Sequence, residues 1–225
     1  MDKEKVVAAV PVYNEADRIG DTVAGLKNVD LIDEILIIND GSVDNTAEII
    51  KKLNVSIITV PQNRGKGYAM KIAIKKMDYD YIAFVDGDLG FTSTEVIKLI
   101  EPVVSGEVDF TIAKFDIPKI KGGFGFVKDL AKKGVFFHTR EEMDTSLSGQ
   151  RVYRKEVIES MRYIPTHYGI EVAMTIQAIN NGYKFKEIPV SMTHRYSDRS
   201  FKGFKHRGRQ FWDIFKTLLY ISFRR

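Results

Sequence analysis

The sequence predicts an α/β fold in which a mainly parallel central sheet has helices on both faces. Two observations carry this prediction: apolar, β-branched runs alternate with helix-like segments throughout the first half, and the links between them are short. Parallel strands need a crossover connection, usually a helix, so this alternation indicates a parallel sheet. A chain of 225 residues is long enough for one such domain with a substantial core and short for two. We therefore expect a single domain over residues 1–225.

The first half of the chain supplies most of the expected elements. Strands are expected at residues 5–10, 34–38, 55–60, 81–85 and 108–113. Helices are expected between them at 16–27, 46–53, 67–76 and 94–104, with Asp44 or Asn45 capping the second. Ligands of open parallel sheets bind beyond the carboxyl ends of the strands. The polar residues that follow these strands are therefore the first candidates for a functional site.

The second half of the chain is less regular. Residues 114–144 are glycine-rich near their start and are expected to be mobile, apart from a short amphipathic helix near 127–136. Strands are expected at 149–153 and 184–192, and helices at 155–161, 168–180 and 203–221. We divide the expected domain into a first part at 1–115, a second at 116–200 and a basic amphipathic helix at 201–225.

Cysteine usage and charge narrow the class of protein. There is no cysteine, which excludes disulfides and thiolate metal sites. The N-terminus lacks the apolar region of a signal peptide, and no apolar run approaches the roughly 20 residues of a membrane-spanning helix, so we expect a cytoplasmic protein. Of the 34 basic and 30 acidic residues, nine and two lie between His194 and Arg225. This basic tail favours an anionic partner such as lipid headgroups, phosphates or nucleic acid.

Asp86-Gly87-Asp88 is the sharpest chemical signal in the sequence. It directly follows the apolar strand expected at 81–85. Alternate residues of an extended chain point the same way, so the two carboxylates can converge on one cation. Mg²⁺ and Mn²⁺ prefer oxygen ligands and typically bridge phosphates. Asp-Gly is also common in turns, which is the alternative, but the position after a buried strand favours a metal site.

Two further polar segments lie at equivalent places. Asp40 follows the second strand, where its carboxylate could accept an N–H of uracil or guanine, although Asp also serves in turns and helix caps. The segment Asn63-Arg64-Gly65-Lys66-Gly67 opens a helix, whose N-terminus attracts anions and where Lys66 adds a point charge. Its spacing is not that of a Walker P-loop. Taken alone, each of these two segments is a weak signal, because turns of this composition are common.

The first half resembles glycosyltransferase family two, whose nucleotide-sugar-binding fold is called GT-A. The matching segments, in the family's order and spacing, are 10–15, 40–42 with Asp44, 63–67 and 86–88. The resemblance covers about the first 115 residues and implies that they form the nucleotide-sugar-binding half. It implies that Pro11, Tyr13, Glu15 and Asp40 surround the nucleoside, that Lys66 lies near the base or diphosphate, and that Asp86 and Asp88 bind the metal.

Three segments of the second half resemble the family more loosely. Leu147-Ser148-Gly149-Gln150-Arg151 is similar to the acceptor-side segment of dolichol-phosphate-mannose synthases and glucosyl-3-phosphoglycerate synthases. Tyr168-Gly169-Ile170-Glu171-Val172 is similar to their helix that brings an acidic residue to the reaction centre. Met192-Thr193-His194-Arg195 is similar to the strand end of the phosphoglycerate enzymes, whose histidine joins the metal shell. The chain continues Leu89-Gly90-Phe91 after Asp88, where polyprenyl-phosphate enzymes usually carry Gln and Pro, so the class of acceptor stays open.

From this resemblance we expect a metal-dependent glycosyltransferase that uses a UDP- or GDP-sugar. Mg²⁺ or Mn²⁺, held by Asp86, Asp88 and His194, would neutralise the diphosphate leaving group. A polyprenyl phosphate or another lipid-linked acceptor is favoured, and a small soluble acceptor such as 3-phosphoglycerate is the alternative. The acceptor side is expected to comprise Ser148, Gly149, Gln150, Arg151, Arg195 and Arg199, with Arg151 also in a catalytic role. An acceptor hydroxyl needs a general base, for which Glu171 is the first candidate and Asp144 the second.

Two other classes of protein remain as alternatives. A nucleotidyltransferase of similar fold would carry a glycine-rich basic signature after the first strand, where this chain has Pro11-Val12-Tyr13-Asn14-Glu15. A non-catalytic module that binds nucleotide sugar or membrane would not need an intact acidic pair. Nucleic acid is not expected as a partner, because no reading motif accompanies the positive charge.

The C-terminal helix is expected to be amphipathic and basic. Its apolar residues recur at helical intervals, namely Phe201, Phe204, Phe211, Phe215, Leu218 and Leu219, with Trp212 beside them. Basic residues lie among them, namely Lys202, Lys205, Arg207, Arg209 and Lys216. Such a stripe suits a helix that lies on an anionic membrane surface. It suits equally a helix that covers the domain's own core or forms a homodimer contact, so all three alternatives stay open.

Overall fold

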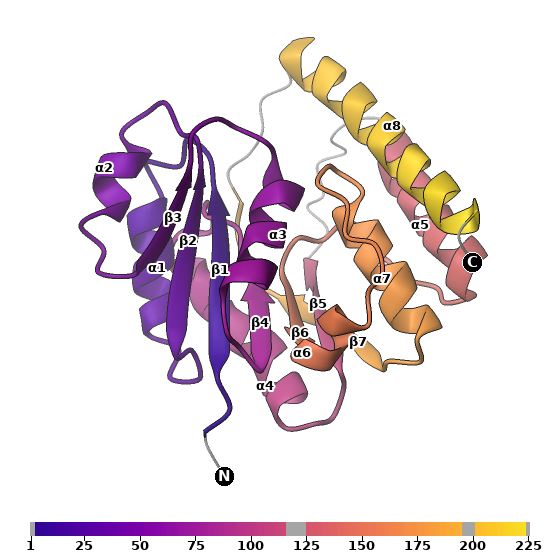
Figure 1. Ribbon diagram of the computed structural model, residues 1–225, viewed down its shortest axis with the longest axis horizontal. Coiled ribbons are helices and arrows are strands. Elements are labelled where there is room, and N and C mark those ends of the chain that lie inside the picture. The colour runs from indigo at the N-terminus through magenta and orange to yellow at the C-terminus, as the bar shows by residue number, and fades with distance from the viewer. Residues whose placement is uncertain (1–2, 116–124, 195–200, 224–225) are drawn as a thin grey trace.

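The computed structural model describes residues 3–115, 125–194 and 201–223, and for 201–207 it describes the backbone alone. Its seven-stranded sheet comprises β1 Val6–Val12, β2 Glu34–Asp40, β3 Ser56–Val60, β4 Tyr81–Phe84, β5 Phe110–Phe115, β6 Arg151–Arg154 and β7 Phe185–Val190. The strand order is β3-β2-β1-β4-β6-β5-β7 (Figure 1). Every pairing is parallel except those of β6, which runs antiparallel to β4 and β5. The predicted α/β fold with a mainly parallel sheet is confirmed.

Helices cover both faces of the sheet, as predicted. They are α1 Ile19–Lys27, α2 Thr46–Ile50, α3 Lys66–Lys76, the 3₁₀ helix η1 Gly90–Val96, α4 Ile97–Val104, α5 Phe126–Thr139, α6 Lys155–Glu159, α7 Ile170–Asn180 and α8 Phe201–Phe223. Buried residues of α1, α2, η1 and α4 join one hydrophobic cluster, and those of α3 and α5 to α8 join the other. The sheet therefore forms the middle of three layers.

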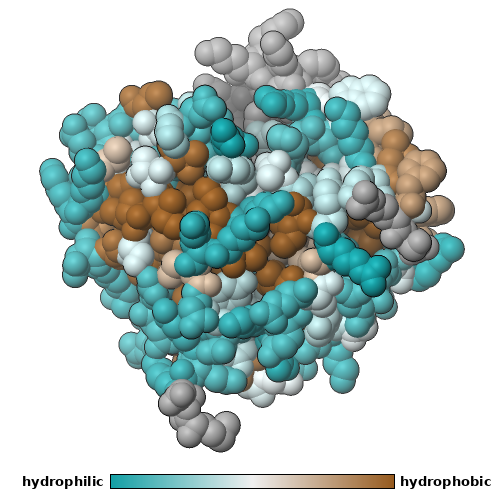
Figure 2. Space-filling view, in the orientation of Figure 1, coloured by the Kyte–Doolittle hydropathy of each residue, from teal (hydrophilic) through white to brown (hydrophobic). Residues whose placement is uncertain are grey.

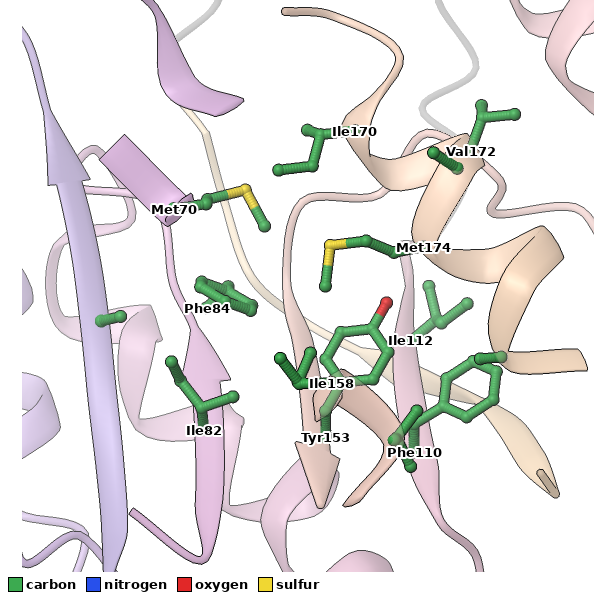
Figure 3. Packing of buried hydrophobic residues seen from close by; sticks show 14 of the residues in the cluster. Met70, Ile82, Phe84, Phe110, Ile112, Tyr153, Ile158, Ile170, Val172 and Met174 are labelled. Atoms are coloured by element: carbon green, nitrogen blue, oxygen red, sulfur yellow. The ribbon is translucent and has the colours of Figure 1, made fainter. Parts of the chain in front are cut away.

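The alternation of side chains along the strands divides the core in two. In β1, Val7 and Ala9 belong to one cluster while Ala8 and Val10 belong to the other. Both faces are apolar because both are covered by helices. In the first cluster, side chains of β4, β5, β6 and α7 meet, including Ile82, Phe84, Phe110, Tyr153 and Met174 (Figure 3). This packing fixes the strands whose ends carry the candidate site.

The antiparallel direction of β6 decides which loops meet. Arg151, the first residue of β6, pairs with Phe84 at the end of β4 and with Ile112 in β5. The residues that precede β6 therefore lie at the same edge of the sheet as those that follow β4. Segments 86–88 and 147–150 are brought together in this way, although about sixty positions separate them in the sequence.

Several expected helices differ from those observed, and α2, expected at 46–53, ends at Ile50. Helix α1 begins at Ile19 rather than residue 16, because Asn14 has a φ of 58° and the Glu15 carbonyl accepts hydrogen bonds from the amides of Arg18 and Ile19. The helix expected at 94–104 is preceded by the 3₁₀ turns of η1. The segment 114–144, expected to be mobile around a short helix, contains the longer helix α5, and its residues 116–124 lie outside the described residues.

Helix α8 packs against α5. A side chain at Gly134 of α5 would collide with Leu218, and the imidazole Nε2 of His138 lies 3.3 Å from the Leu218 carbonyl oxygen. Ile214, Leu218 and Ile221 are buried in this contact region. Leu218, one of the stripe residues for which membrane, core and dimer contacts were left open, is therefore a core residue. Among the described residues, no helix has both the length and the apolar character needed to cross a membrane.

Candidate active site

The loop after β4 brings Asp86 and Asp88 to the site edge of the sheet. Gly87 between them packs against β1, because a Cβ there would lie 2.6 Å from the Cγ1 of Val12. The backbone of the loop is held from α1: Thr22 Oγ1 donates to the Gly87 carbonyl at 2.9 Å, and Arg18 Nη1 donates to the Asp88 carbonyl at 3.1 Å. These contacts fix the loop without using either carboxylate.

His194 completes a cluster with the two carboxylates. It follows β7, and its Nδ1 lies 3.1 Å from the Oδ1 of Asp88. One ligand atom each from Asp86, Asp88 and His194 lie within 4.8 Å of one another. Two carboxylates and one imidazole are donors that suit Mn²⁺ and Mg²⁺. The three residues expected at the metal are therefore close enough to share one ion.

Lys66 lies between this cluster and α7. Its ammonium donates a hydrogen bond to Asp86 and lies 3.9 Å from a carboxylate oxygen of Glu171. Burial alone would raise the pKa of Asp86, but the charge and hydrogen bond of Lys66 outweigh it and hold this pKa below its ordinary value. Gly149 leaves the space for this arrangement, because a side chain there would collide with the Lys66 ammonium.

The residues expected around the nucleoside line one cavity of about 310 Å³. Its lining includes Pro11, Tyr13, Glu15, Asp40, Lys66, Asp86, Asp88 and Tyr168. The carboxylate of Asp40 is buried and accepts hydrogen bonds from the amides of Arg64, at 2.9 Å, and Gly65, at 2.6 Å. Asp40 therefore holds the loop that begins α3, a role that its position in the sequence did not reveal.

Replacing Asp40 by alanine is expected to weaken binding of a nucleoside diphosphate by about 1–3 kcal/mol, the usual cost of losing a charged hydrogen bond. The loop at Arg64 and Gly65 would also lose its anchor. Isothermal titration calorimetry of the free nucleotide measures the change. Asp78→Ala is the matched control, since the Asp78 side chain is 92% exposed and makes one ion pair with Lys155. Equal affinities for the two variants would reduce Asp40 to a turn residue.

A second cavity, of about 420 Å³, opens on the other side of Lys66 and Asp86. Its lining includes Lys114, Lys128, Asp144, Ser148, Gly149, Gln150 and His194. Within the part of the chain that the structure describes, the buried Oγ of Ser148 and the Oε1 of Gln150 have no hydrogen-bond partner, while Gln150 also interacts with Asp86. Buried polar groups are normally satisfied, so these atoms are suited to hold a ligand. Arg195 and Arg199, expected on the acceptor side, lie outside the described residues.

Arg151 does not line either cavity. Its side chain is fully buried, and its guanidinium donates to the carbonyls of Ser146, Ser148 and Glu171. It also donates to the Tyr153 hydroxyl and to Thr175 Oγ1. The expectation that Arg151 contacts an acceptor phosphate is corrected by this structure, in which the guanidinium ties the segment before β6 to α7 and has no exposed atom.

The two candidate bases have opposite environments. Glu171, in the first turn of α7, is buried, and burial raises its pKa in spite of Lys66 and Arg151. Asp144 is exposed, and its hydrogen bonds with Lys132 and Lys114 hold its pKa below the ordinary value. A base with a raised pKa accepts a proton more readily near neutral pH. By its pKa, Glu171 is therefore the better suited base of the two, whereas Asp144 is the one that lines the acceptor cavity.

Several residues of the site were not anticipated from the sequence. Lys114 lies beside Asp144 on the acceptor side. It is near the carboxyl end of β5, which is where ligands of parallel sheets bind, so its position could have been used to find it. Lys128 reaches the same cavity from α5, and Tyr168 lines the nucleoside cavity. Thr22 and Arg18 of the α1 region hold the acidic loop through its backbone. No local pattern marks these last two residues, because only the fold brings α1 to the loop.

Comparison with known proteins shows which family this chain resembles in sequence. Residues 7–162 match the family Glycosyl transferase family 2. Glycosyltransferase AglJ of Haloferax volcanii is 25% identical over 194 residues, which cover 84% of this chain and 63% of that protein. An uncharacterized protein of Methanocaldococcus jannaschii is 29% identical over 207 residues, covering 84% of this chain and 82% of that one.

A solved structure shares the fold. Glucosyl-3-phosphoglycerate synthase from Mycobacterium tuberculosis, in complex with Mn²⁺, UDP and phosphoglyceric acid, superposes with a TM-score of 0.79. The two chains are 21% identical, and the match covers 96% of this chain and 78% of that one. The fold is therefore that of the GT-A glycosyltransferases. The resemblance drawn from the sequence is confirmed, and the chain belongs to glycosyltransferase family 2.

Proposed function

We propose that this protein is a metal-dependent glycosyltransferase that moves a sugar from a UDP- or GDP-sugar to an acceptor that carries a phosphate. The observation that carries the proposal is the convergence of Asp86, Asp88 and His194 between two cavities, one on the nucleoside side and one on the acceptor side. Family membership favours glycosyl transfer over nucleotidyl transfer and over a purely binding role.

The metal would be held by Asp86, Asp88 and His194, whose oxygen and imidazole donors fit Mg²⁺ or Mn²⁺. When bound, such an ion supplies positive charge that stabilises the diphosphate leaving group. M. tuberculosis glucosyl-3-phosphoglycerate synthase was crystallised with UDP and Mn²⁺, and with UDP and Mg²⁺. This supports the choice of ion and of a nucleoside diphosphate.

The protein's own residues position the donor. Asp40 and the loop that it holds border the nucleoside cavity, whose lining extends to Lys66 and Asp86. Burial lowers the pKa of Lys66, but the nearby carboxylates of Asp86 and Glu171 outweigh it, so the lysine stays protonated. A protonated Lys66 beside the acidic pair can contact the diphosphate and stabilise the charge that develops there.

The acceptor cavity favours an anionic molecule. Its lining holds Lys66, Lys114 and Lys128 against Asp86 and Asp144, so lysines are in excess. The unpartnered Ser148 Oγ and Gln150 Oε1 lie on the same wall. A lipid-linked phosphate such as polyprenyl phosphate is our favoured acceptor, since a phosphate oxygen is already an anion near pH 7 and needs no base. A soluble acceptor such as 3-phosphoglycerate would react through a hydroxyl, and Glu171 would then remove its proton.

A thermal-shift panel tests the proposal. One of the UDP-, GDP- and ADP-sugars, with Mn²⁺, is expected to raise the Tm by roughly 5–10 °C at a hundredfold excess over its Kd, because a ligand of the native state stabilises it. The same sugar in EDTA is expected to give a smaller shift. If no nucleotide sugar raises the Tm with Mn²⁺, the proposed donor is wrong.

The acceptor is then identified with the radiolabelled form of the donor. Incubation with polyprenyl phosphate should move the label into the lipid extract, whereas incubation with 3-phosphoglycerate leaves it in the aqueous phase. No label in the lipid extract, together with a labelled product of 3-phosphoglycerate that anion-exchange chromatography separates from the donor, would favour the soluble acceptor.

A further inference from the structure

Helix α8 has a second apolar stripe that does not face the core. The exposed fractions are 59% for Trp212, 37% for Phe215, 41% for Leu219 and 85% for Phe223. Their spacing of three and four residues places them on one side of the helix. The buried residues Ile214, Thr217, Leu218 and Ile221 occupy the opposite side. One apolar stripe of the helix therefore packs into the core, and the other is exposed at the surface.

Helix α5 extends this surface. It packs beside α8 through Gly134 and His138, and its Phe137 is 63% exposed. Figure 2 shows hydrophobic surface along the edge where α8 lies in Figure 1. We call Phe137, Trp212, Phe215, Leu219 and Phe223 the outer aromatic face. Single exposed hydrophobic residues are ordinary in a monomer, but a group of this size on two packed helices indicates an interaction surface.

The charges on the same two helices are mainly positive. The exposed basic residues are Arg209 and Lys216 on α8 and Lys128, Lys132 and Lys133 on α5, of which Lys132 forms an ion pair with Asp144. The acidic residues on the described parts of these helices are Asp129 and Asp213. Aromatic side chains flanked by lysine and arginine suit the boundary between headgroups and acyl chains of an anionic bilayer. The same excess of positive charge disfavours a symmetric contact with a second copy, which would bring like charges together.

We infer that the outer aromatic face docks this protein reversibly on an anionic membrane surface. The inference deepens the proposed function and rests on its lipid-linked acceptor, because Lys128 of α5 also lines the acceptor cavity. Helix α5 therefore connects the outer aromatic face to the acceptor cavity, where a lipid phosphate would bind. Docking is measured without turnover, so the failure of the inference can be told apart from failure of the proposed activity.

Vesicle co-sedimentation of the full chain tests the inference. The protein is expected to sediment with vesicles of phosphatidylcholine and phosphatidylglycerol at low salt, and to bind pure phosphatidylcholine at least about tenfold more weakly. Binding should also fall as NaCl is raised to about 0.5 M, because salt screens the charges. Recovery of the full chain in the supernatant with anionic vesicles at low salt would overturn the inference.

Single substitutions test whether the outer aromatic face is the part of the protein that contacts the membrane. Leu219→Glu and Phe223→Glu are expected to reduce binding more than tenfold, and Lys216→Glu about fivefold or more, since one basic residue contributes about that factor. Phe91→Glu is the matched control, because Phe91 is 59% exposed on η1, away from this face. Circular dichroism of each variant checks that folding is unchanged. Equal binding by Leu219→Glu and Phe91→Glu would overturn the assignment, as would a dimer in light scattering that Leu219→Glu converts to a monomer.

Discussion

Replacing Asp88 by alanine is expected to lower turnover by about a thousandfold or more, because the metal contributes several kcal/mol to stabilising the leaving group. The variant loses one carboxylate of the metal cluster and the partner of His194. Its fold should persist, since Thr22 and Arg18 hold this loop through backbone carbonyls rather than through the Asp88 side chain. Steady-state assays with Mn²⁺ measure the loss of turnover, and calorimetry measures Mn²⁺ binding.

The controls separate loss of metal from loss of fold. Asp86→Ala is expected to have a similar effect on turnover, and it also leaves Lys66 without its closest anion. Asp78→Ala, which removes an exposed carboxylate from a single ion pair, should keep full activity. Undiminished wild-type activity in EDTA, or normal turnover by Asp88→Ala, would rule out the metal role of the acidic pair.

Replacing Arg151 by methionine is expected to lower the free energy of unfolding by about 3–5 kcal/mol, because several buried hydrogen bonds from one charged donor are lost together. The guanidinium is fully buried, and its removal leaves the carbonyls of Ser146, Ser148 and Glu171 without this donor. Each buried acceptor left unpaired costs about 1–3 kcal/mol. Urea denaturation followed by circular dichroism measures the change.

Arg154→Met provides a matched comparison on the same strand. Its side chain is 40% exposed and pairs with Asp109 and Glu156, so the expected loss is about 1 kcal/mol or less. If the two variants were equally stable, Arg151 would not be a structural anchor. Because Arg151 supports the backbone of both the acceptor segment and Glu171, acceptor transfer and donor hydrolysis should slow together. The acceptor-side role expected for Arg151 from the sequence would instead slow transfer more than hydrolysis.

The sheet and the donor side of the site could be predicted because they depend on local patterns. Parallel strands end at one edge, so polar residues placed directly after apolar runs must gather there. Asp40, Asp86 and Asp88 follow this rule, and in the structure all three line one cavity. His194 was added through a family resemblance, and the structure places it beside Asp88.

The burial of Arg151 and the orientation of α8 could not be predicted, because they depend on contacts between segments that are far apart in the sequence. The burial of Arg151 follows from the insertion of β6 between β4 and β5, which no periodicity in the sequence reveals. The inner and outer stripes of α8 are both apolar, and only the approach of α5 selects Leu218 for the core. His138 and Leu218 are 80 residues apart, so this choice lies beyond any local window of sequence.

The direction of β6 also has a consequence for how such proteins diversify. The cavity on the nucleoside side is lined by residues of β1 and β2 and of the loop after β4, whereas Ser148, Gly149 and Gln150 lie just before a strand that enters the sheet from the site edge. A change of length in the connection between β5 and β6 would therefore reshape one wall of the site without moving the strands that border the nucleoside-side cavity. Loops tolerate such insertions and deletions far better than strands do. Related proteins can in this way come to differ in their acceptor while they keep the same nucleotide-sugar donor.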